Sequence, residues 1–235
     1  MKWDACGDAS LPNRVVLKPM PSFRCQAILF DLDGVLIDAD LIYERHWKAW
    51  ATRHQVSFER ILEVHHGSPA ARTIQIVAPH LDAVAEARDY NHGLEEDTDM
   101  SGAVAYPGVK EILEKLPPDR WAIATSASRK IARARLQYLG LPVPSVLITP
   151  EDVRQGKPAP DPYLKAAEGI GFSAEECLVI EDAPAGIDAA RAAGARVIAL
   201  TTTHGEESLG EADAIASSFA DLEIQVGDAG LEVSW

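Results

Sequence analysis

The sequence has few cysteines, no long apolar run and no excess of positive charge. Its 235 residues include three cysteines, an odd and widely separated set without the spacing of a metal site. Reduced thiols are therefore favoured over a disulfide framework. No apolar run approaches the roughly 20 residues that a membrane-spanning helix needs, and the first 24 residues lack the apolar segment of a signal peptide. We expect a cytoplasmic protein that does not enter a membrane.

The balance of charge is strongly acidic. The 36 aspartates and glutamates outnumber the 22 lysines and arginines, which gives a formal net charge of -14 at pH 7. Such a surface repels nucleic acid and anionic membranes, so neither is expected as a partner. A small anionic substrate is compatible with it, because salt screens the distant charges more than those of one local positive site. The chain is long enough for a core with a smaller inserted domain.

An apolar run at residues 27–36 contains two aspartates one residue apart, Asp31 and Asp33. A short run rich in branched and aromatic side chains is typical of a buried strand of a parallel sheet. Such sheets bind ligands beyond the carboxyl ends of their strands, so we expect both aspartates at a binding crevice. On a continuing strand the two side chains share one face. Two negative charges held so close favour a bound cation, a shared proton or both.

Residues 39–104 show helical patterns and no strand-like run. Tyr43, Trp47 and Trp50 follow the i, i+4, i+7 spacing of an amphipathic helix. Further helical patterns extend to about residue 100, with breaks at 67–69 and 91–93. A helical block inserted directly after a strand with candidate catalytic residues is typical of a lid over the crevice.

From residue 105 onward, helical faces alternate with short apolar strands, the pattern of βαβ units in a parallel sheet. Strands are predicted at 121–125, 145–149, 177–180 and 196–200. Asp161 is a predicted N-cap with Pro162 at the first helical position. Residues 222–233 alternate with period two around a glycine turn, which predicts a β-hairpin at a sheet edge.

These patterns together predict an α/β protein with a Rossmann-like parallel sheet and an inserted α-helical cap domain. The predicted core consists of residues 25–38 and 105–235, and the predicted cap of residues 39–104. Residues 1–24 contain three prolines and no sustained periodicity, so we expect a loosely attached N-terminal extension.

Four groups of polar residues fall at, or just after, the carboxyl ends of predicted strands. They are Asp31 with Asp33, Thr125 with Ser126, Lys157 between a glycine and a proline, and Glu181 with Asp182. In a parallel sheet these ends lie on one edge, so the groups converge there. Crowded carboxylates repel one another unless a hard divalent cation lies among them, and Mg²⁺ suits such oxygen ligands. A lysine and a hydroxyl opposite them suit a dianion. The set predicts Mg²⁺-assisted phosphoryl transfer.

The same residues resemble the motifs of the haloacid dehalogenase (HAD) superfamily, in its phosphatase branch with a helical cap after the first motif. The resemblance covers the chain from about residue 25. The four motifs correspond to residues 31–35, to Thr125 with Ser126, to Lys157 within 156–161, and to residues 181–186. The resemblance implies a HAD-like fold and a Mg²⁺-dependent phosphatase that works through an aspartyl phosphate.

The resemblance also implies a role for each residue of the site. Asp31 would be the nucleophile, and Asp33 the acid that protonates the leaving oxygen and then the base that activates water. Mg²⁺ would be held by Asp31, the backbone carbonyl of Asp33 and Asp182, with Glu181 beside it. Lys157 would pair with Asp31 and the phosphate. The remaining phosphate-binding residues would be Thr125, Ser126 and Ala127.

Three other activities or roles are compatible with the same fold to different degrees. Dehalogenation in this superfamily does not need Asp33, whose presence therefore points to phosphate chemistry. Sugar phosphomutases resembling β-phosphoglucomutase carry a histidine on the first cap helix, where this chain has Tyr43, with His46 further along. A non-catalytic phosphate-binding module needs neither Asp31 nor Asp33. Hydrolysis is therefore favoured, with the phosphomutase and the binding module as alternatives.

Within the family, the sequence resembles bacterial sugar phosphatases and yeast glycerol-3-phosphate and 2-deoxyglucose-6-phosphate phosphatases. This implies a small phosphorylated sugar or polyol as the substrate, and we expect a monomer with a dimer as the alternative. The candidate specificity residues are His66, Gly67 and Arg72, with Tyr43 and Trp47 as stacking or packing surfaces. Trp47 and Trp50 at helical spacing also fit the interior of the cap, and His65 and His66 also fit a solvated loop.

Overall fold

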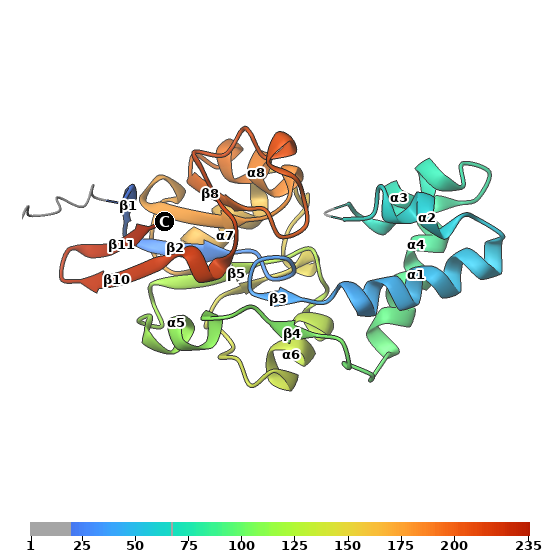
Figure 1. The fold of residues 1–235 in the computed structure, drawn as a ribbon, viewed down its shortest axis with the longest axis horizontal. Coiled ribbons are helices and arrows are strands. Elements are labelled where there is room, and N and C mark those ends of the chain that lie inside the picture. The colour runs from blue at the N-terminus through green and yellow to red at the C-terminus, as the bar shows by residue number, and fades with distance from the viewer. Residues whose placement is uncertain (1–19, 67) are drawn as a thin grey trace, which may run out of the picture.

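The computed structural model describes residues 20–66 and 68–235. A six-stranded parallel sheet with the order β6-β5-β2-β7-β8-β9 lies at the centre of the larger part of the molecule (Figure 1). Its strands are β2 (Ala27–Phe30), β5 (Trp121–Ala124), β6 (Leu147–Ile148), β7 (Cys177–Glu181), β8 (Arg196–Leu200) and β9 (Ala214–Ala216). Counted along the chain, these strands follow the order 3-2-1-4-5-6 of doubly wound folds. The predicted α/β class is confirmed.

Helices cover both faces of the sheet, because successive side chains of a strand point to opposite sides. Ile28 and Phe30 pack in the same core as α5 (Val109–Lys115) and α6 (Arg129–Tyr138). Ala27 and Leu29 pack in a second core with α7 (Asp161–Gly169) and α8 (Pro184–Ala192). Short 3₁₀ helices occur at Pro150–Asp152, Ala174–Glu176, Glu206–Ser208 and Phe219–Asp221. None of the described helices is long and apolar enough to cross a membrane.

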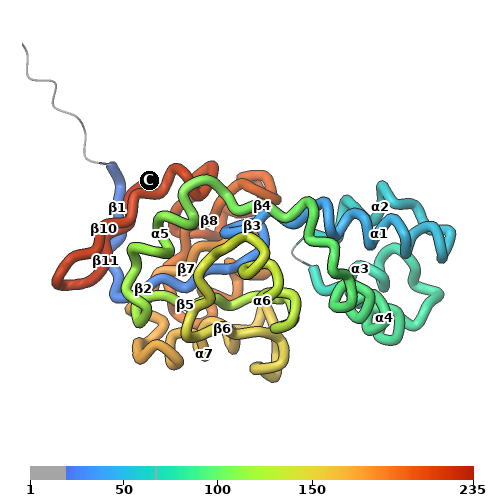
Figure 2. The backbone as a smooth tube through the Cα atoms, turned by 90° about the horizontal axis from the view of Figure 1, so that it is seen from below, coloured from blue at the N-terminus to red at the C-terminus, as the bar shows by residue number. Residues whose placement is uncertain are grey.

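Four helices form a separate block beside the sheet, as Figure 1 and Figure 2 show from two directions. They are α1 (Asp40–His54), α2 (Phe58–Leu62), α3 (Ala70–Val77) and α4 (Ala83–Glu96). Where the chain enters and leaves the block, β3 (Ile37–Asp38) pairs antiparallel with β4 (Val104–Ala105). Inside the block, Trp47 stacks on Tyr90 with ring centroids 4.0 Å apart and meets Trp50 edge-on. The tryptophans at helical spacing therefore belong to its interior.

Several boundaries differ from the sequence predictions. β2 ends at Phe30, so Asp31 and Asp33 lie in the loop after the strand and do not share a strand face. α4 continues through residues 91–93, because Tyr90 and Leu94 on either side of them are buried and hold the helix in place. The N-cap position of α7 is Pro160, and Asp161 is the first helical residue.

The two ends of the described chain form a second sheet. β1 (Ser22–Cys25), β11 (Gly230–Ser234) and β10 (Glu223–Gly227) pair antiparallel in the order β1-β11-β10. The predicted C-terminal hairpin is present, but it does not extend the edge of the parallel sheet. Residues 22–24, assigned to a loose extension, belong to a paired strand instead. Residues 1–19 of that predicted extension lie outside the described residues.

Candidate active site

Three carboxylates meet where two neighbouring strands end. Asp31 follows β2, and its N–H donates to the carbonyl oxygen of Ile180 in β7 at 3.0 Å. Glu181 is the last residue of β7 and Asp182 follows it. The three side chains are buried, and an oxygen of each lies within 4.8 Å of the others. The sheet order reverses next to β2, which is where doubly wound folds bind their ligands.

Lys157 connects two of these carboxylates. Its Nζ donates to Asp31 Oδ1 at 2.5 Å and to Glu181 Oε1 at 2.7 Å. Tyr163 on α7 also donates to Glu181 Oε1, at 2.8 Å, and its ring lies 4.9 Å from the ammonium. The second oxygen of Glu181 accepts the N–H groups of Asp182 and Ala183. Glu181 is therefore fully engaged by the protein, whereas Asp31 and Asp182 retain free oxygen lone pairs.

The charges of this cluster do not balance. Burial and the nearby charge of Glu181 raise the pKa of Asp31 to about 7, although Lys157 opposes the shift. Burial and the same neighbour also raise the pKa of Asp182 well above its usual value. For Glu181, burial is outweighed by Lys157, and the pKa is lowered. The raised pKa values reflect an excess of carboxyl groups over ammonium groups in the cluster, and this set of hard oxygen ligands therefore fits a divalent cation.

Two glycines let the backbone approach the acidic side chains directly. Gly34 adopts φ +85°, and a Cβ there would lie 2.1 Å from Asp182 Oδ2. A Cβ at Gly186 on α8 would lie 1.6 Å from Glu181 Oε1. Both contacts are far shorter than any van der Waals distance, so a larger residue at either position would displace a carboxylate. These glycines explain why glycine recurs within the first and fourth predicted motifs.

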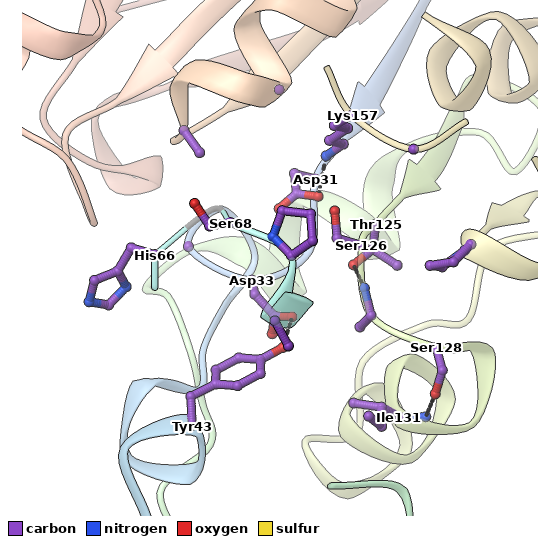
Figure 3. A pocket seen from close by; sticks show the side chains of 18 of the residues that line it. Asp31, Asp33, Tyr43, His66, Ser68, Thr125, Ser126, Ser128, Ile131 and Lys157 are labelled. Carbon is purple, nitrogen blue, oxygen red and sulfur yellow. Dashed lines mark hydrogen bonds and ion pairs between the residues drawn. The ribbon is translucent and has the colours of Figure 1, made fainter. Parts of the chain in front are cut away.

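Asp33 is held by two residues on other elements. Arg135 Nη1 on α6 donates to Asp33 Oδ1 at 2.6 Å, and the Tyr43 hydroxyl on α1 donates to Asp33 Oδ2 at 3.1 Å. Figure 3 shows Asp33 directed towards Tyr43, whereas Asp31 is directed towards Lys157. Sequence reasoning did not select Arg135. The sequence does contain one indication of a buried arginine: Arg135 lies four residues after Ile131, on the otherwise apolar face of α6.

The loop after β5 carries the predicted phosphate-binding residues. Thr125 is buried, and its hydroxyl accepts the N–H of Ala127 at 3.0 Å. This hydrogen bond holds the loop in shape. It also occupies the Ala127 N–H and one lone pair of the Thr125 hydroxyl, which are therefore not free to bind phosphate. Ser126 is exposed between them, and Figure 3 shows it near Asp31 and Asp33. Ser126 therefore remains the strongest phosphate-binding candidate of this loop.

The five predicted specificity residues have different surroundings. Tyr43 and Trp47 line the cavity beside the carboxylates, and so does His66, whose Nδ1 lies 3.6 Å from Asp40 Oδ1. Arg72 is exposed on α3 and is not brought to the cavity. Gly67 lies outside the described residues.

Two further histidines of the block were considered from the sequence, and only one of them lines the cavity. His65 lines the same cavity and is buried, not solvated, so that burial and the neighbouring His66 lower its pKa to about 4. His46 contacts Asp97 at 2.7 Å and is not among the cavity residues. It therefore does not replace the histidine that the phosphomutases carry on this helix.

A cavity of about 650 Å³ joins these parts. Its floor contains the carboxylates, Lys157 and the loop after β5. Its roof comes from the helical block, which contributes His66, Ser68, Pro69, Tyr90, Asn91 and Glu95. A volume of this size accommodates a small organic ligand. The cavity thus places a strongly charged floor opposite a roof of mixed polar and aromatic side chains.

The fold and the site define a hydrolase of the haloacid dehalogenase-like class, and comparison with known proteins agrees. Residues 25–194 match the model of the haloacid dehalogenase-like hydrolase family, so the chain belongs to this family. Hexitol phosphatase A of Escherichia coli is 39% identical over 86% of this chain and 94% of its own. Glycerol-1-phosphate phosphohydrolase 2 of Saccharomyces cerevisiae is 34% identical over 79% of this chain and 78% of its own.

A solved structure of another protein has a similar fold. A hydrolase from Pseudomonas syringae superposes with a TM-score of 0.70 at 28% identity, over 83% of this chain and 94% of that one. The similarity to the HAD superfamily that the four motifs indicate is confirmed by the match to the family model, and the solved structure supports the fold.

Proposed function

We propose that this protein is a Mg²⁺-dependent phosphatase that hydrolyses small sugar or polyol phosphates through an aspartyl phosphate. One observation carries the proposal: Asp31, Glu181 and Asp182 surround one point with Lys157 beside them, at the strand ends where the fold binds ligands. In this proposal Asp31, Asp182 and the backbone carbonyl of Asp33 hold Mg²⁺, and Glu181 holds Lys157. The cation would offset the charge of the phosphoryl group and orient it.

The first step transfers the phosphoryl group to the protein. An oxygen of Asp31 attacks phosphorus, the bond from phosphorus to the sugar or polyol oxygen breaks, and Asp33 gives that oxygen a proton. Lys157 and Ser126 hold the phosphoryl oxygens as their charge increases. In the second step Asp33 takes a proton from water, whose oxygen attacks phosphorus. The bond to Asp31 then breaks, and inorganic phosphate leaves.

We propose that the helical block is a cap domain of residues 39–104 on a core of residues 25–38 and 105–235. The space between this cap and the core limits the size of the substrate. The block encloses the cavity of about 650 Å³ above the carboxylates. Similarity to a hexitol phosphatase and to a glycerol-1-phosphate phosphohydrolase supports a phosphorylated polyol or sugar. We propose that His66 and Trp47, which line this cavity, contact the carbon chain or ring.

The test is a screen of the purified full chain with Mg²⁺ against phosphorylated polyols, sugars and nucleotides, with released phosphate as the readout. We expect release from polyol or sugar phosphates and little from nucleotides. A clear preference for nucleotides would overturn the substrate class and leave the mechanism in place. An isomerised sugar phosphate without free phosphate would instead identify a phosphomutase.

A further inference from the structure

A buried arginine forms a closed triangle of hydrogen bonds around Asp33. Arg135 Nη1 donates to Asp33 Oδ1 at 2.6 Å and to the Tyr43 hydroxyl oxygen at 2.9 Å. The same hydroxyl donates to the second oxygen of Asp33, at 3.1 Å. The guanidinium also lies over the Tyr43 ring, 4.6 Å from its centroid. The two anchors hold two different oxygens, so the carboxyl group cannot turn about its bond to Cβ.

This arrangement is costly for the fold. The Arg135 side chain is 1% exposed and sits on the core face of α6 beside Ile131 and Leu136. Among the described residues, Asp33 is its only ion-pair partner, and its Nε has no hydrogen-bond acceptor. Replacing the whole of such a buried ion pair by apolar side chains of similar volume is often neutral or stabilising. The pair is therefore weak evidence for a role in stability, and Arg135 requires a further explanation.

The triangle leaves Asp33 accessible from the cavity. The Asp33 side chain is 21% exposed and lines the cavity with Tyr43, whereas Arg135 lies behind them and does not. The three residues of the triangle come from three elements: Asp33 from the loop after β2, Tyr43 from helix α1 of the block and Arg135 from helix α6 of the core. Asp33 thus presents one face to a ligand while the opposite face is fixed to both parts of the molecule.

We propose that Arg135 and Tyr43 are positioning residues that orient Asp33 for proton transfer to the leaving oxygen. The proposal rests on the phosphatase function above, and it assigns the Tyr43 hydroxyl to Asp33 instead of to the substrate. Neither residue touches the reacting atoms. They affect the reaction only by holding the Asp33 carboxyl group in one orientation.

Two substrates whose leaving groups differ in their need for a proton distinguish this positioning role from a purely structural one. Departure of an alkoxide needs a proton from Asp33, whereas p-nitrophenolate leaves readily without one. The quantity to compare is kcat/KM, which includes the steps up to departure of the leaving group. The probes are p-nitrophenyl phosphate and either glycerol 1-phosphate or a hexitol 6-phosphate, whichever the unmodified protein hydrolyses faster.

The decisive variant is Tyr43→Phe, which keeps the ring under Arg135 and removes only the hydroxyl. We expect kcat/KM for the alkyl phosphate to fall by about 10-fold or more, within the roughly 10²- to 10⁴-fold that general acid catalysis contributes. The value for p-nitrophenyl phosphate falls much less. Tyr138→Phe on the exposed side of α6 is the matched control and changes neither value. Arg135→Lys, which retains a charge but not the planar guanidinium, is expected to act in the same direction.

Equal losses on both probes, or no loss on either, would overturn the positioning role. Thermal unfolding of each variant shows that it is folded, and Tyr43→Phe decides the question if Arg135→Lys does not fold. Absence of phosphate release by the unmodified protein on every probe would contradict the proposed function itself and the positioning role with it. The two failures are therefore distinguishable.

Discussion

Lys157 and the three buried carboxylates show how single residues prepare the site for a cation. The ammonium is shared between Asp31 and Glu181, and the Tyr163 hydroxyl and two backbone N–H groups complete the shell of Glu181. Asp182 has no cationic side chain within ion-pair distance among the described residues and accepts only the hydroxyl of Thr203 through its side chain. A carboxylate buried in this way is costly unless positive charge reaches it. Of the proposed metal ligands, Asp182 is therefore the one that we expect to depend most directly on a bound cation.

Asp182→Asn is expected to weaken metal binding more than folding. The amide keeps the shape of the side chain and an acceptor for Thr203, but it removes one negative charge from the metal site. Because even partners that only support a ligand contribute 10- to 100-fold to metal affinity, we expect the Mg²⁺ concentration for half-maximal phosphate release to rise on the order of 100-fold.

Titration of phosphate release with Mg²⁺, after removal of metal by a chelator, checks this expectation. Asp188→Asn, on the exposed side of α8, is the matched control and leaves the Mg²⁺ requirement unchanged. An unchanged requirement in Asp182→Asn would exclude Asp182 as a ligand.

Among the elements, the first and last helices of the block are joined by a polar cluster. Asp97, just after α4, accepts hydrogen bonds from Arg45 and His46 of α1 at 2.7 Å each. Burial alone would raise the pKa of Asp97, but these hydrogen bonds outweigh it and hold the pKa well below the usual value. The cluster closes the block near the chain segment that leads back to β4.

Asp97→Asn is expected to lower the free energy of unfolding by about 1 to 2 kcal/mol at pH 7, because hydrogen bonds to a charged group are lost. A carboxyl whose pKa is depressed in the folded state stabilises the fold above its unfolded pKa, and the stabilisation is lost as the pH falls. The difference between the two proteins should therefore be full above about pH 4 and shrink below it.

Urea-induced unfolding at several pH values measures this difference. Asp89→Asn, on the exposed part of α4, serves as the control and shows little change at any pH. A difference for Asp97→Asn that stays constant across the acid range would show that the carboxylate charge is not the cause.

The elements also show where sequence reasoning works. The strands and helices from β5 to β8 were predicted in the right order, because apolar periodicity reports which faces are buried. The continuity of α4 through residues 91–93 was missed because it depends on the burial of Tyr90 and Leu94 against other helices. The pairing of β1 with β11 was missed because residues as far apart as Ser22 and Ser234 form it. Local patterns carry no information about such contacts.

The architecture of the whole molecule explains why the sequence indicates the site residues but not most of the residues that contact them. The parallel sheet places every strand end on one edge, so residues that follow strands converge whatever their separation in sequence. Asp31, Lys157 and Glu181 were predictable for this reason. Arg135, Thr203 and Tyr163 reach the site from helices and loops, and their contribution depends on side-chain direction. That direction exists only once the sheet, its helices and the block are assembled.

The same arrangement divides the work between the two parts of the molecule. The core supplies the charged floor of the cavity, and the helical block supplies a roof that touches the floor through Tyr43 and Asp33. Family membership fixes the class of the protein as a haloacid dehalogenase-like hydrolase. Within this cavity, we propose that Asp31 is the nucleophile of a phosphatase reaction.

The substitution Asp31→Asn gives a direct test of this role. The substitution preserves the size of the side chain and removes the negatively charged oxygen that would attack phosphorus. The measurement is the rate of phosphate release from the best polyol or sugar phosphate at saturating Mg²⁺, with circular dichroism to show that the variant is folded. We predict a folded protein with no release above background. Release by Asp31→Asn at the rate of the unmodified protein would exclude Asp31 as the nucleophile.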